Sequence, residues 1–206
     1  MILLLIADGR SIHTQRWAEY FAHQGHEVHL ITYDPMNRVI PGVAEYVLTS
    51  RFSNLYLSFV PRHFAIKWLV KVIKPDLIHA HFIAKYGFHL PDLGFHPSIV
   101  SAWGDDVLIL PKKSRLINYY SRKVLESVDL IYGVSHNISE HIVADFSIAP
   151  KKVHYLPFGI DTNLFRPNEE KAPRTDRLIQ VFSGVIVDQP ALFRQDEDII
   201  APGRDN

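Results

Sequence analysis

Short runs of consecutive apolar residues alternate along this chain with longer segments in which apolar residues recur at helical spacing. The first run, at 2–7, contains no polar residue, and such a run is typical of a parallel strand that is covered on both faces. The pattern predicts strands at 2–7, 27–32, 43–48, 77–80, 98–102, 130–134 and 153–156, and helices at 11–24, 61–74, 85–90, 114–127 and 136–146. This alternation predicts a Rossmann-like α/β fold with a doubly wound, mostly parallel sheet in the order 3-2-1-4-5 or a close variant.

Glycine and proline mark the ends of several of these elements. Gly25 follows the first helix in the position of a helix stop. Pro61 is expected in the first turn of the helix at 61–74, because the backbone N–H groups of a first turn make no hydrogen bond within the helix and proline lacks this group. Pro75 is expected to end that helix, because the residue before a proline avoids the helical conformation.

The character of the chain changes after Pro167. Residues 168–177 are polar and charged, as in a linker, and the apolar run after them predicts one more strand at 178–183. We therefore expect a domain at 1–167, a linker at 168–177, and the start of a second domain with a divergent tail at 178–206. The tail is either a foreign or truncated end, produced by a frameshift or a split gene, or a genuine short segment that packs on the sheet.

The composition excludes several classes of function. The 22 basic and 22 acidic residues give no net charge, so no global field recruits nucleic acid, and we expect no nucleic-acid partner. The absence of cysteine excludes disulfides, thiolate metal sites and cysteine nucleophiles. The first residues lack a basic leader, and no apolar run approaches the roughly 18 residues of a membrane span. We expect a cytoplasmic protein that is soluble or peripheral at a membrane surface.

The loop after the first predicted strand opens a helix. Gly9, Ser11 and His13 lie at this helix N-terminus, whose free N–H groups favour phosphate or another anion. The loop has one glycine, so it is neither the three-glycine dinucleotide fingerprint nor a P-loop. An ordinary helix start capped by Ser11 or Thr14 explains the same residues equally well.

Two histidines end the strand predicted at 77–80. His79 and His81 are two positions apart and so point to the same face of the sheet. The carboxyl end of a parallel strand is where open α/β sheets bind ligands. Two imidazoles alone do not complete a metal site, and we expect none. One buried structural histidine beside one solvent-facing histidine is the simpler alternative.

Two further loops follow predicted strands. Trp103, Gly104 and Asp106 come directly after the strand at 98–102, in a glycine loop where the backbone passes close to something. Gly-Asp-Asp is also common turn chemistry. Ser135 follows the strand at 130–134 and is explained by a helix cap alone.

Two windows combine basic and aromatic residues. Neither 51–74 nor 112–123 contains an acidic residue. A basic helix with aromatic residues suits a membrane surface, and the outer helix of an ordinary α/β domain shows the same pattern. Both interpretations remain open from the sequence.

The segment VHYLPFGIDTNLFRP, at 153–167, is the most specific motif of the chain. It resembles the segment that precedes the interdomain hinge in family 4 glycosyltransferases of the GT-B fold. The resemblance covers about 1–184 and implies an acceptor-side half-domain that lacks the donor domain. It implies that His81 bonds or deprotonates the acceptor hydroxyl and that Asp106 accepts hydrogen bonds from acceptor hydroxyls. It also implies substrate binding by Gly9, Ser11, His13, Trp103, Gly104 and Ser135.

The implied activity is transfer of a sugar from a nucleotide-sugar to a hydroxyl of a cell-envelope or lipid-linked glycan. The resemblance implies mostly retaining chemistry, without a metal or other cofactor. We expect this chain alone to be inactive and to need a donor domain. The alternative is a non-catalytic acceptor-binding or membrane-docking subunit that pairs with a separate donor-domain chain. A Rossmann oxidoreductase is disfavoured by the missing three-glycine loop.

Overall fold

The computed structural model describes residues 1–50, 55–160, 162, 179–182 and 185–188. Residues Met1–Phe158 form one compact unit, and Gly159–Asn206 form a second. The predicted boundary at 167 and the linker at 168–177 lie outside the described residues and stay predictions.

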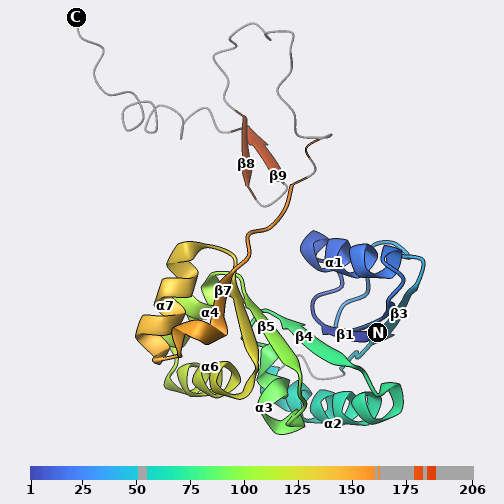
Figure 1. Cartoon of the computed structure of the whole chain (residues 1–206), viewed down its shortest axis with the longest axis horizontal. Coiled ribbons are helices and arrows are strands. Elements are labelled where there is room, and N and C mark those ends of the chain that lie inside the picture. The colour runs from blue at the N-terminus through green and yellow to red at the C-terminus, as the bar shows by residue number, and fades with distance from the viewer. Residues whose placement is uncertain (51–54, 161, 163–178, 183–184, 189–206) are drawn as a thin grey trace, which may run out of the picture. The chain divides into compact units, whose positions relative to one another are not determined.

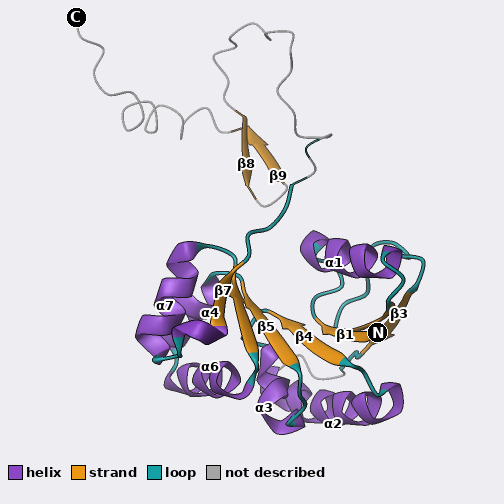
Figure 2. Cartoon of the chain, in the orientation of Figure 1, coloured by secondary structure: helices purple, strands orange, loops and turns teal. Residues whose placement is uncertain are grey.

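The first unit is built on a seven-stranded parallel sheet in the order β3-β2-β1-β4-β5-β6-β7. Its strands are β1 (Ile2–Ile6), β2 (Glu27–Thr32), β3 (Val43–Val47), β4 (Leu77–His81), β5 (Ser98–Ala102), β6 (Leu130–Gly133) and β7 (Val153–Tyr155). The predicted α/β class, parallel sheet and strand order are confirmed. Figure 2 shows the strands as a central layer between helices.

Helices cover both faces of this sheet (Figure 1). The helical segments are α1 (Ile12–His23), α2 (Leu55–Ile73), η1 (Gly87–His89), α3 (Leu90–Leu93), α4 (Asp105–Leu108), α5 (Leu110–Lys113), α6 (Arg115–Ser127), α7 (His136–Phe146) and η2 (Pro150–Lys152). Helices α2, α3 and α6 lie along one side of the sheet, and α1 lies on the other (Figure 1).

Two hydrophobic cores follow from the alternation of side chains along the strands. Leu3 and Leu5 of β1 pack with Ala18 of α1 in the smaller core. Leu4 and Ile6, which point the opposite way, belong to the larger core, which includes residues of α2, α6 and α7. Unbroken apolar strands are needed here because each strand face meets a different core.

Helix α2 differs from its prediction. It begins at Leu55, so Pro61 lies inside the helix and not in its first turn. Proline removes one backbone N–H donor from the hydrogen bonds of the helix. The side of α2 that faces the sheet compensates for this loss by packing, because Ile66 and Leu69 are buried in the larger core. The predicted helix at 85–90 is instead the short η1 followed by α3.

The second unit is described at two strands. β8 (Ile179–Phe182) and β9 (Val185–Asp188) form an antiparallel pair. The strand predicted at 178–183 is therefore present at its described positions. The residues beyond β9, where the sequence predicted a divergent tail, lie outside the described part of the chain.

The two basic windows lie mainly on α2 and α6, which are on the same side of the sheet with α3 between them (Figure 1). The described part of 51–74 is α2 and its end, and 112–123 covers the end of α5 and most of α6. Tyr119 and Leu116 of α6 are about half exposed. No helix within the described ranges is long and apolar enough to cross a membrane.

Candidate functional site

Four rings meet at the carboxyl edge of the sheet, contributed by segments that follow different strands. His13 stacks on Phe158 with ring centroids 3.7 Å apart and an interplanar angle of 12°. Trp103 lies edge-on to both, at 5.7 Å from His13 and 5.3 Å from Phe158. His81 lies 5.6 Å from the Trp103 ring. We refer to His13, His81, Trp103 and Phe158 as the edge cluster.

His81 is the innermost member of the edge cluster. Its side chain is buried, and its Nδ1 atom lies 3.2 Å from the hydroxyl of Thr14 on α1. Its Nε2 atom has no hydrogen-bond partner among the described residues. Burial, reinforced by the nearby His13, lowers the pKa of His81 from 6.5 to about 3. The imidazole is therefore neutral at physiological pH.

His79 lies beside His81 on the same face of the sheet. The two ring centroids are 4.5 Å apart, as the two-residue strand spacing predicted. The Nε2 atom of His79 is 2.8 Å from the hydroxyl of Ser101, and the edge of the Trp17 ring covers it. Both histidines are buried, so the alternative in which one faces solvent is wrong. Within the described ranges no group of three metal-ligating side chains forms.

Asp106 is fully buried, and both of its carboxylate oxygens accept hydrogen bonds from backbone N–H groups. Its Oδ1 atom accepts from the N–H groups of Trp103 at 3.0 Å and Gly104 at 2.9 Å. Its Oδ2 atom accepts from the N–H of Ile83 at 2.8 Å. Burial raises the pKa of Asp106, and these N–H donors oppose the rise by favouring the carboxylate. Asp106 thus joins the loop after β4 to the loop after β5.

Gly104 holds a conformation that other residues rarely adopt. Its φ of 139° lies in the region open to glycine, and its N–H points to Asp106. This backbone turns the chain from β5 into α4 and leaves the Trp103 ring, which is half-buried, at the sheet edge. The glycine loop predicted from the sequence therefore serves to place Trp103 and Asp106.

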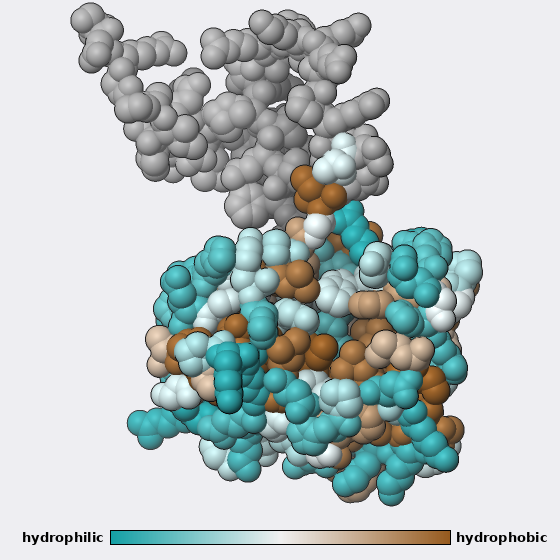
Figure 3. Space-filling view, in the orientation of Figure 1, coloured by the Kyte–Doolittle hydropathy of each residue, from teal (hydrophilic) through white to brown (hydrophobic). Residues whose placement is uncertain are grey.

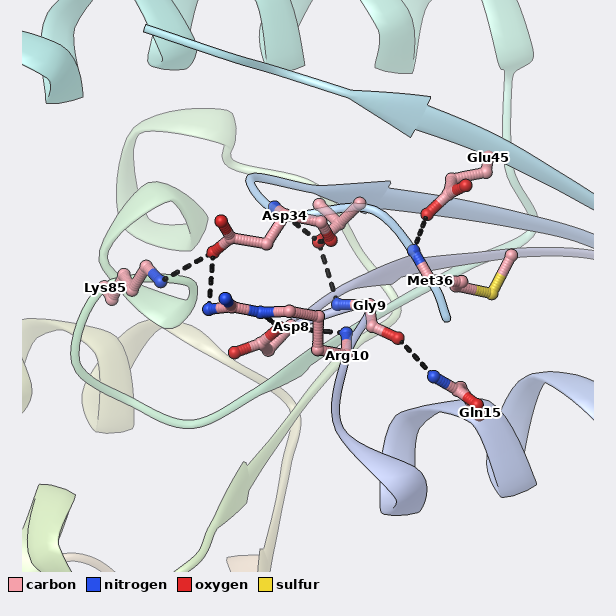
Figure 4. Close-up of polar contacts among 9 residues, drawn as sticks. Asp8, Gly9, Arg10, Gln15, Asp34, Met36, Glu45 and Lys85 are labelled. Atoms are coloured by element: carbon pink, nitrogen blue, oxygen red, sulfur yellow. Dashed lines mark hydrogen bonds and ion pairs between the residues drawn. The ribbon is translucent and has the colours of Figure 1, made fainter. Parts of the chain in front are cut away.

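The loop after β1 packs against the segment after β2 (Figure 4). The N–H of Gly9 donates to the Thr32 hydroxyl at 2.8 Å, and its carbonyl accepts from the Gln15 side chain at 2.7 Å. A Cβ atom at Gly9 would lie 2.7 Å from the backbone oxygen of Asp34. The close approach that this glycine permits is therefore to protein backbone.

We expect Gly9→Ala to lower the free energy of unfolding by about 1–3 kcal/mol, the usual cost of overpacking a closed site. The new methyl group meets the Asp34 carbonyl, and a backbone atom cannot rotate away as a side chain does. Urea unfolding followed by circular dichroism measures the loss. Gly159→Ala is the matched control, because no atom lies within 4 Å of a Cβ at that position. Equal stability of Gly9→Ala and the unmodified chain would contradict this packing.

Charged side chains of three loops meet beside Gly9 (Figure 4). The guanidinium of Arg10 donates to Asp34 at 3.1 Å, and the backbone N–H of Arg10 donates to Asp8 at 3.0 Å. The ammonium of Lys85 lies 4.0 Å from the same Asp34 carboxylate. Both cations are thus held at the carboxyl edge of the sheet.

The two predicted serines behave differently. Ser135 caps α7, because its hydroxyl accepts from the N–H of Ile138 at 3.2 Å. Ser11 occupies the cap position of α1 but makes no side-chain cap hydrogen bond, and Thr14 is directed to His81 instead. The side-chain cap expected at the start of α1 is therefore absent.

Sequence reasoning missed three residues of this region. Thr14 contacts His81, Phe158 stacks on His13, and Lys85 pairs with Asp34, which also binds Arg10 beside Gly9. Phe158 stood inside the hinge motif, but nothing local indicated that it stacks on His13. Thr14 was weighed only as a helix cap, and its true partner lies on a distant strand.

The comparisons with known proteins agree with this architecture. The family model described as "Glycosyl transferase 4-like" matches residues 2–137. The chain belongs to this glycosyltransferase 4-like family. A Bacillus subtilis (strain 168) protein, whose name assigns it to teichuronic acid biosynthesis as a glycosyltransferase, is 24% identical over 179 residues. That match covers 81% of this chain and 43% of the relative, so the chain spans less than half the length of this curated relative.

Solved structures of low sequence identity share the fold. Sucrose-phosphate synthase of Thermosynechococcus elongatus superposes with a TM-score of 0.64 at 16% identity, over 82% of this chain and 50% of the other. Anabaena HepE in complex with UDP gives a TM-score of 0.59 at 14% identity, over 82% of this chain and 46% of the other. These likenesses establish the GT-B type of half-domain that the hinge motif implied.

Proposed function

We propose that this chain is the acceptor-side half of a glycosyltransferase that transfers a sugar from a nucleotide-sugar to a cell-envelope or lipid-linked glycan. The observation that carries the proposal is the edge cluster, which gathers side chains of four separate segments at the carboxyl ends of the strands. This is the edge at which open α/β sheets bind ligands. Family membership supports transfer chemistry, and the teichuronic acid name of one relative supports an envelope glycan.

Within this site we assign a hydrogen-bonding role to His81. A pKa of about 3 makes its imidazole too weak a base to take a proton efficiently near pH 7. Its Nε2 atom is buried and has no hydrogen-bond partner among the described residues, and it is the atom that we propose bonds an acceptor hydroxyl. The half-buried Trp103 offers an apolar face to a sugar ring.

Asp106 is assigned a positioning role in place of direct acceptor contact. Its two oxygens already accept three backbone N–H groups, so a sugar hydroxyl competes with bonds that hold two loops in place. Gly104 is assigned to the same support, and Ser135 to the cap of α7. Gly9 and Ser11, which lie beside His13 of the edge cluster in sequence, are proposed together with His13 to face the donor diphosphate.

The nucleotide-sugar and a separate donor-domain chain are proposed partners of this half. One structural neighbour was solved with UDP, which supports a uridine nucleotide as the first donor class to try. The competing proposal is a subunit that binds the acceptor without catalysis. Transfer of labelled sugar by a reconstituted pair of chains separates the two, because the subunit proposal predicts binding without transfer at every donor tested.

We expect acceptor glycan fragments to shift the indole N–H signal of Trp103 in a ¹⁵N NMR titration of the chain. Trp103→Ala is expected to weaken glycan binding by up to about tenfold, since an aromatic contact supplies about 0.5–1.5 kcal/mol. Trp68→Ala is the matched control, because Trp68 is exposed on α2. Binding that shifts Trp68 alone, or that survives Trp103→Ala unchanged, would rule out the edge cluster as the acceptor site.

A further inference from the structure

The Thr14 hydroxyl is the hydrogen-bond partner of His81, and it determines where the proton of the neutral imidazole lies. The oxygen of this hydroxyl is 3.2 Å from Nδ1 of His81, across 67 positions of the chain. Both side chains are buried, and within the described ranges neither makes another side-chain hydrogen bond. A neutral imidazole has one N–H donor and one bare nitrogen that accepts. The contact with Thr14 therefore selects between two tautomers of His81.

The two tautomers leave different buried groups without a partner. If the Thr14 hydroxyl donates to a bare Nδ1, the ring proton lies on Nε2, and this N–H is the one group left unpaired. If an Nδ1–H group donates to the Thr14 oxygen, the Thr14 O–H and a bare Nε2 are both left unpaired. Unpaired buried polar groups cost stability, so the first arrangement is favoured.

The helix backbone does not supply a substitute partner for the Thr14 hydroxyl. On α7, the hydroxyl of Ser139 donates to the carbonyl of Ser135 in the preceding turn, at 3.2 Å. Thr14 makes no such bond to α1 within the described part of the chain, although a threonine in a helix can do so. Its proton is therefore available to His81.

The neighbours of His81 leave its Nε2 atom unpaired. His79 lies 4.5 Å away between ring centroids, and its own Nε2 atom is 2.8 Å from the Ser101 hydroxyl. The rings of Trp17 and Trp103 lie 5.7 and 5.6 Å from His81. Figure 3 shows hydrophobic and hydrophilic residues side by side at the surface, so surface hydropathy alone does not mark the site. The unpaired Nε2 atom is the more specific indication.

We propose that Thr14 is a positioning residue, which holds His81 with its proton on Nε2 so that the imidazole presents an N–H donor to a substrate oxygen. The identity of that substrate rests on the proposed function, whereas the tautomer rests on Thr14 and His81 alone. An Nε2–H group has no lone pair with which to take a proton, so a hydroxyl that it binds keeps its own. His81 then orients the acceptor glycan and does not deprotonate it.

Imidazole ¹⁵N NMR of the chain at pH 7 tests the tautomer without any sugar, because a bare ring nitrogen resonates far downfield of a protonated one. We expect the His81 signals to report a bare Nδ1 and a protonated Nε2. Thr14→Val keeps the shape of the side chain and removes the hydroxyl. The proton should then distribute over both ring nitrogens, and their two signals should move toward each other. Thr14→Ser should restore the signals of the unmodified chain.

Ser101→Ala is the matched control, because it removes the hydroxyl beside the neighbouring histidine. It should move the signals of His79 and leave those of His81 in place. A protonated Nδ1 of His81 in the unmodified chain overturns the proposal. So do His81 signals that are the same in Thr14→Val as in the unmodified chain.

Glycan binding supplies a second readout. In a titration with acceptor fragments, Thr14→Val should weaken binding about twofold to tenfold, which is the usual effect of one hydrogen bond, and Thr14→Ser should bind as the unmodified chain does. Equal binding by Thr14→Val overturns the role of Thr14 in the site. If the unmodified chain shows the expected tautomer but binds no glycan, the proposed function fails and the tautomer set by Thr14 stands.

Discussion

Lowering the pH from 7 to 5 is expected to remove about 4 kcal/mol from the free energy of unfolding through two buried histidines, His81 and His89. The pKa of each is lowered from 6.5 to about 3, mainly because burial disfavours the charged imidazole. His79, whose pKa is also lowered by burial, acts in the same direction. A loss of this size is a large part of the stability of an ordinary domain.

The sign follows from which state binds more protons. Between pH 3 and 6.5, His81 and His89 are protonated in the unfolded chain, whereas both stay neutral in the folded chain. Stability is therefore fully present above the unfolded pKa and falls as the pH drops below it, by up to about 1.4 kcal/mol per pH unit for each histidine. Urea unfolding at several pH values measures this slope.

A single substitution isolates one contribution. His89 is buried, with Tyr33 near its Nε2 atom and His63 near its Nδ1 atom. His89→Gln removes one titrating group. It should reduce the slope of the unfolding free energy against pH by up to about 1.4 kcal/mol per pH unit, whatever it does to stability at pH 7. His23→Gln, at an exposed histidine of α1, is the matched control for the substitution itself. A flat pH profile between 7 and 5 would mean that these histidines are not buried as the structure shows.

Asp106→Ala is expected to lower the free energy of unfolding by about 3 kcal/mol or more. The substitution leaves the N–H groups of Ile83, Trp103 and Gly104 without their acceptor, and each buried unpaired donor costs about 1–3 kcal/mol. The carboxylate also holds the loop after β4, where Phe82 has a φ of 74°. Such a backbone conformation persists only where its surroundings enforce it.

The neighbouring acid provides the control. Asp105 is exposed in the first turn of α4, so Asp105→Ala should change stability by no more than about 0.5 kcal/mol. Asp106→Asn keeps the shape and one good acceptor, and should fall between the two. Urea unfolding at pH 7 measures all three variants. If Asp106→Ala and Asp105→Ala prove equally stable, the assigned positioning role is lost.

His79 and His81 show which properties of the site follow from the local sequence and which do not. The facing of His79 and His81 follows from the strand period alone, and the structure confirms it. Their depth does not follow, because burial depends on α1 and its Trp17, which come from another part of the chain. For the same reason the sequence left open whether His81 bonds or deprotonates an acceptor hydroxyl, because the burial that lowers the pKa of its imidazole comes from distant segments.

The sequence by itself determined the α/β class, the parallel strand order, the helix at 136–146 with its Ser135 cap, and the family of this chain. The fold class and the helix with its cap rest on periodicity and turn chemistry, which act between residues close in the chain. The strand order rests on the rules for connecting parallel strands, and the family rests on the resemblance of the motif at 153–167. Only the tertiary structure decided that the Asp106 carboxylate accepts hydrogen bonds from backbone N–H groups, that Phe158 completes the edge cluster, and that α2 extends through Pro61. Each of these depends on which distant segments pack together, since hydrogen-bond partners and burial are set by long-range contacts and not by neighbours in sequence.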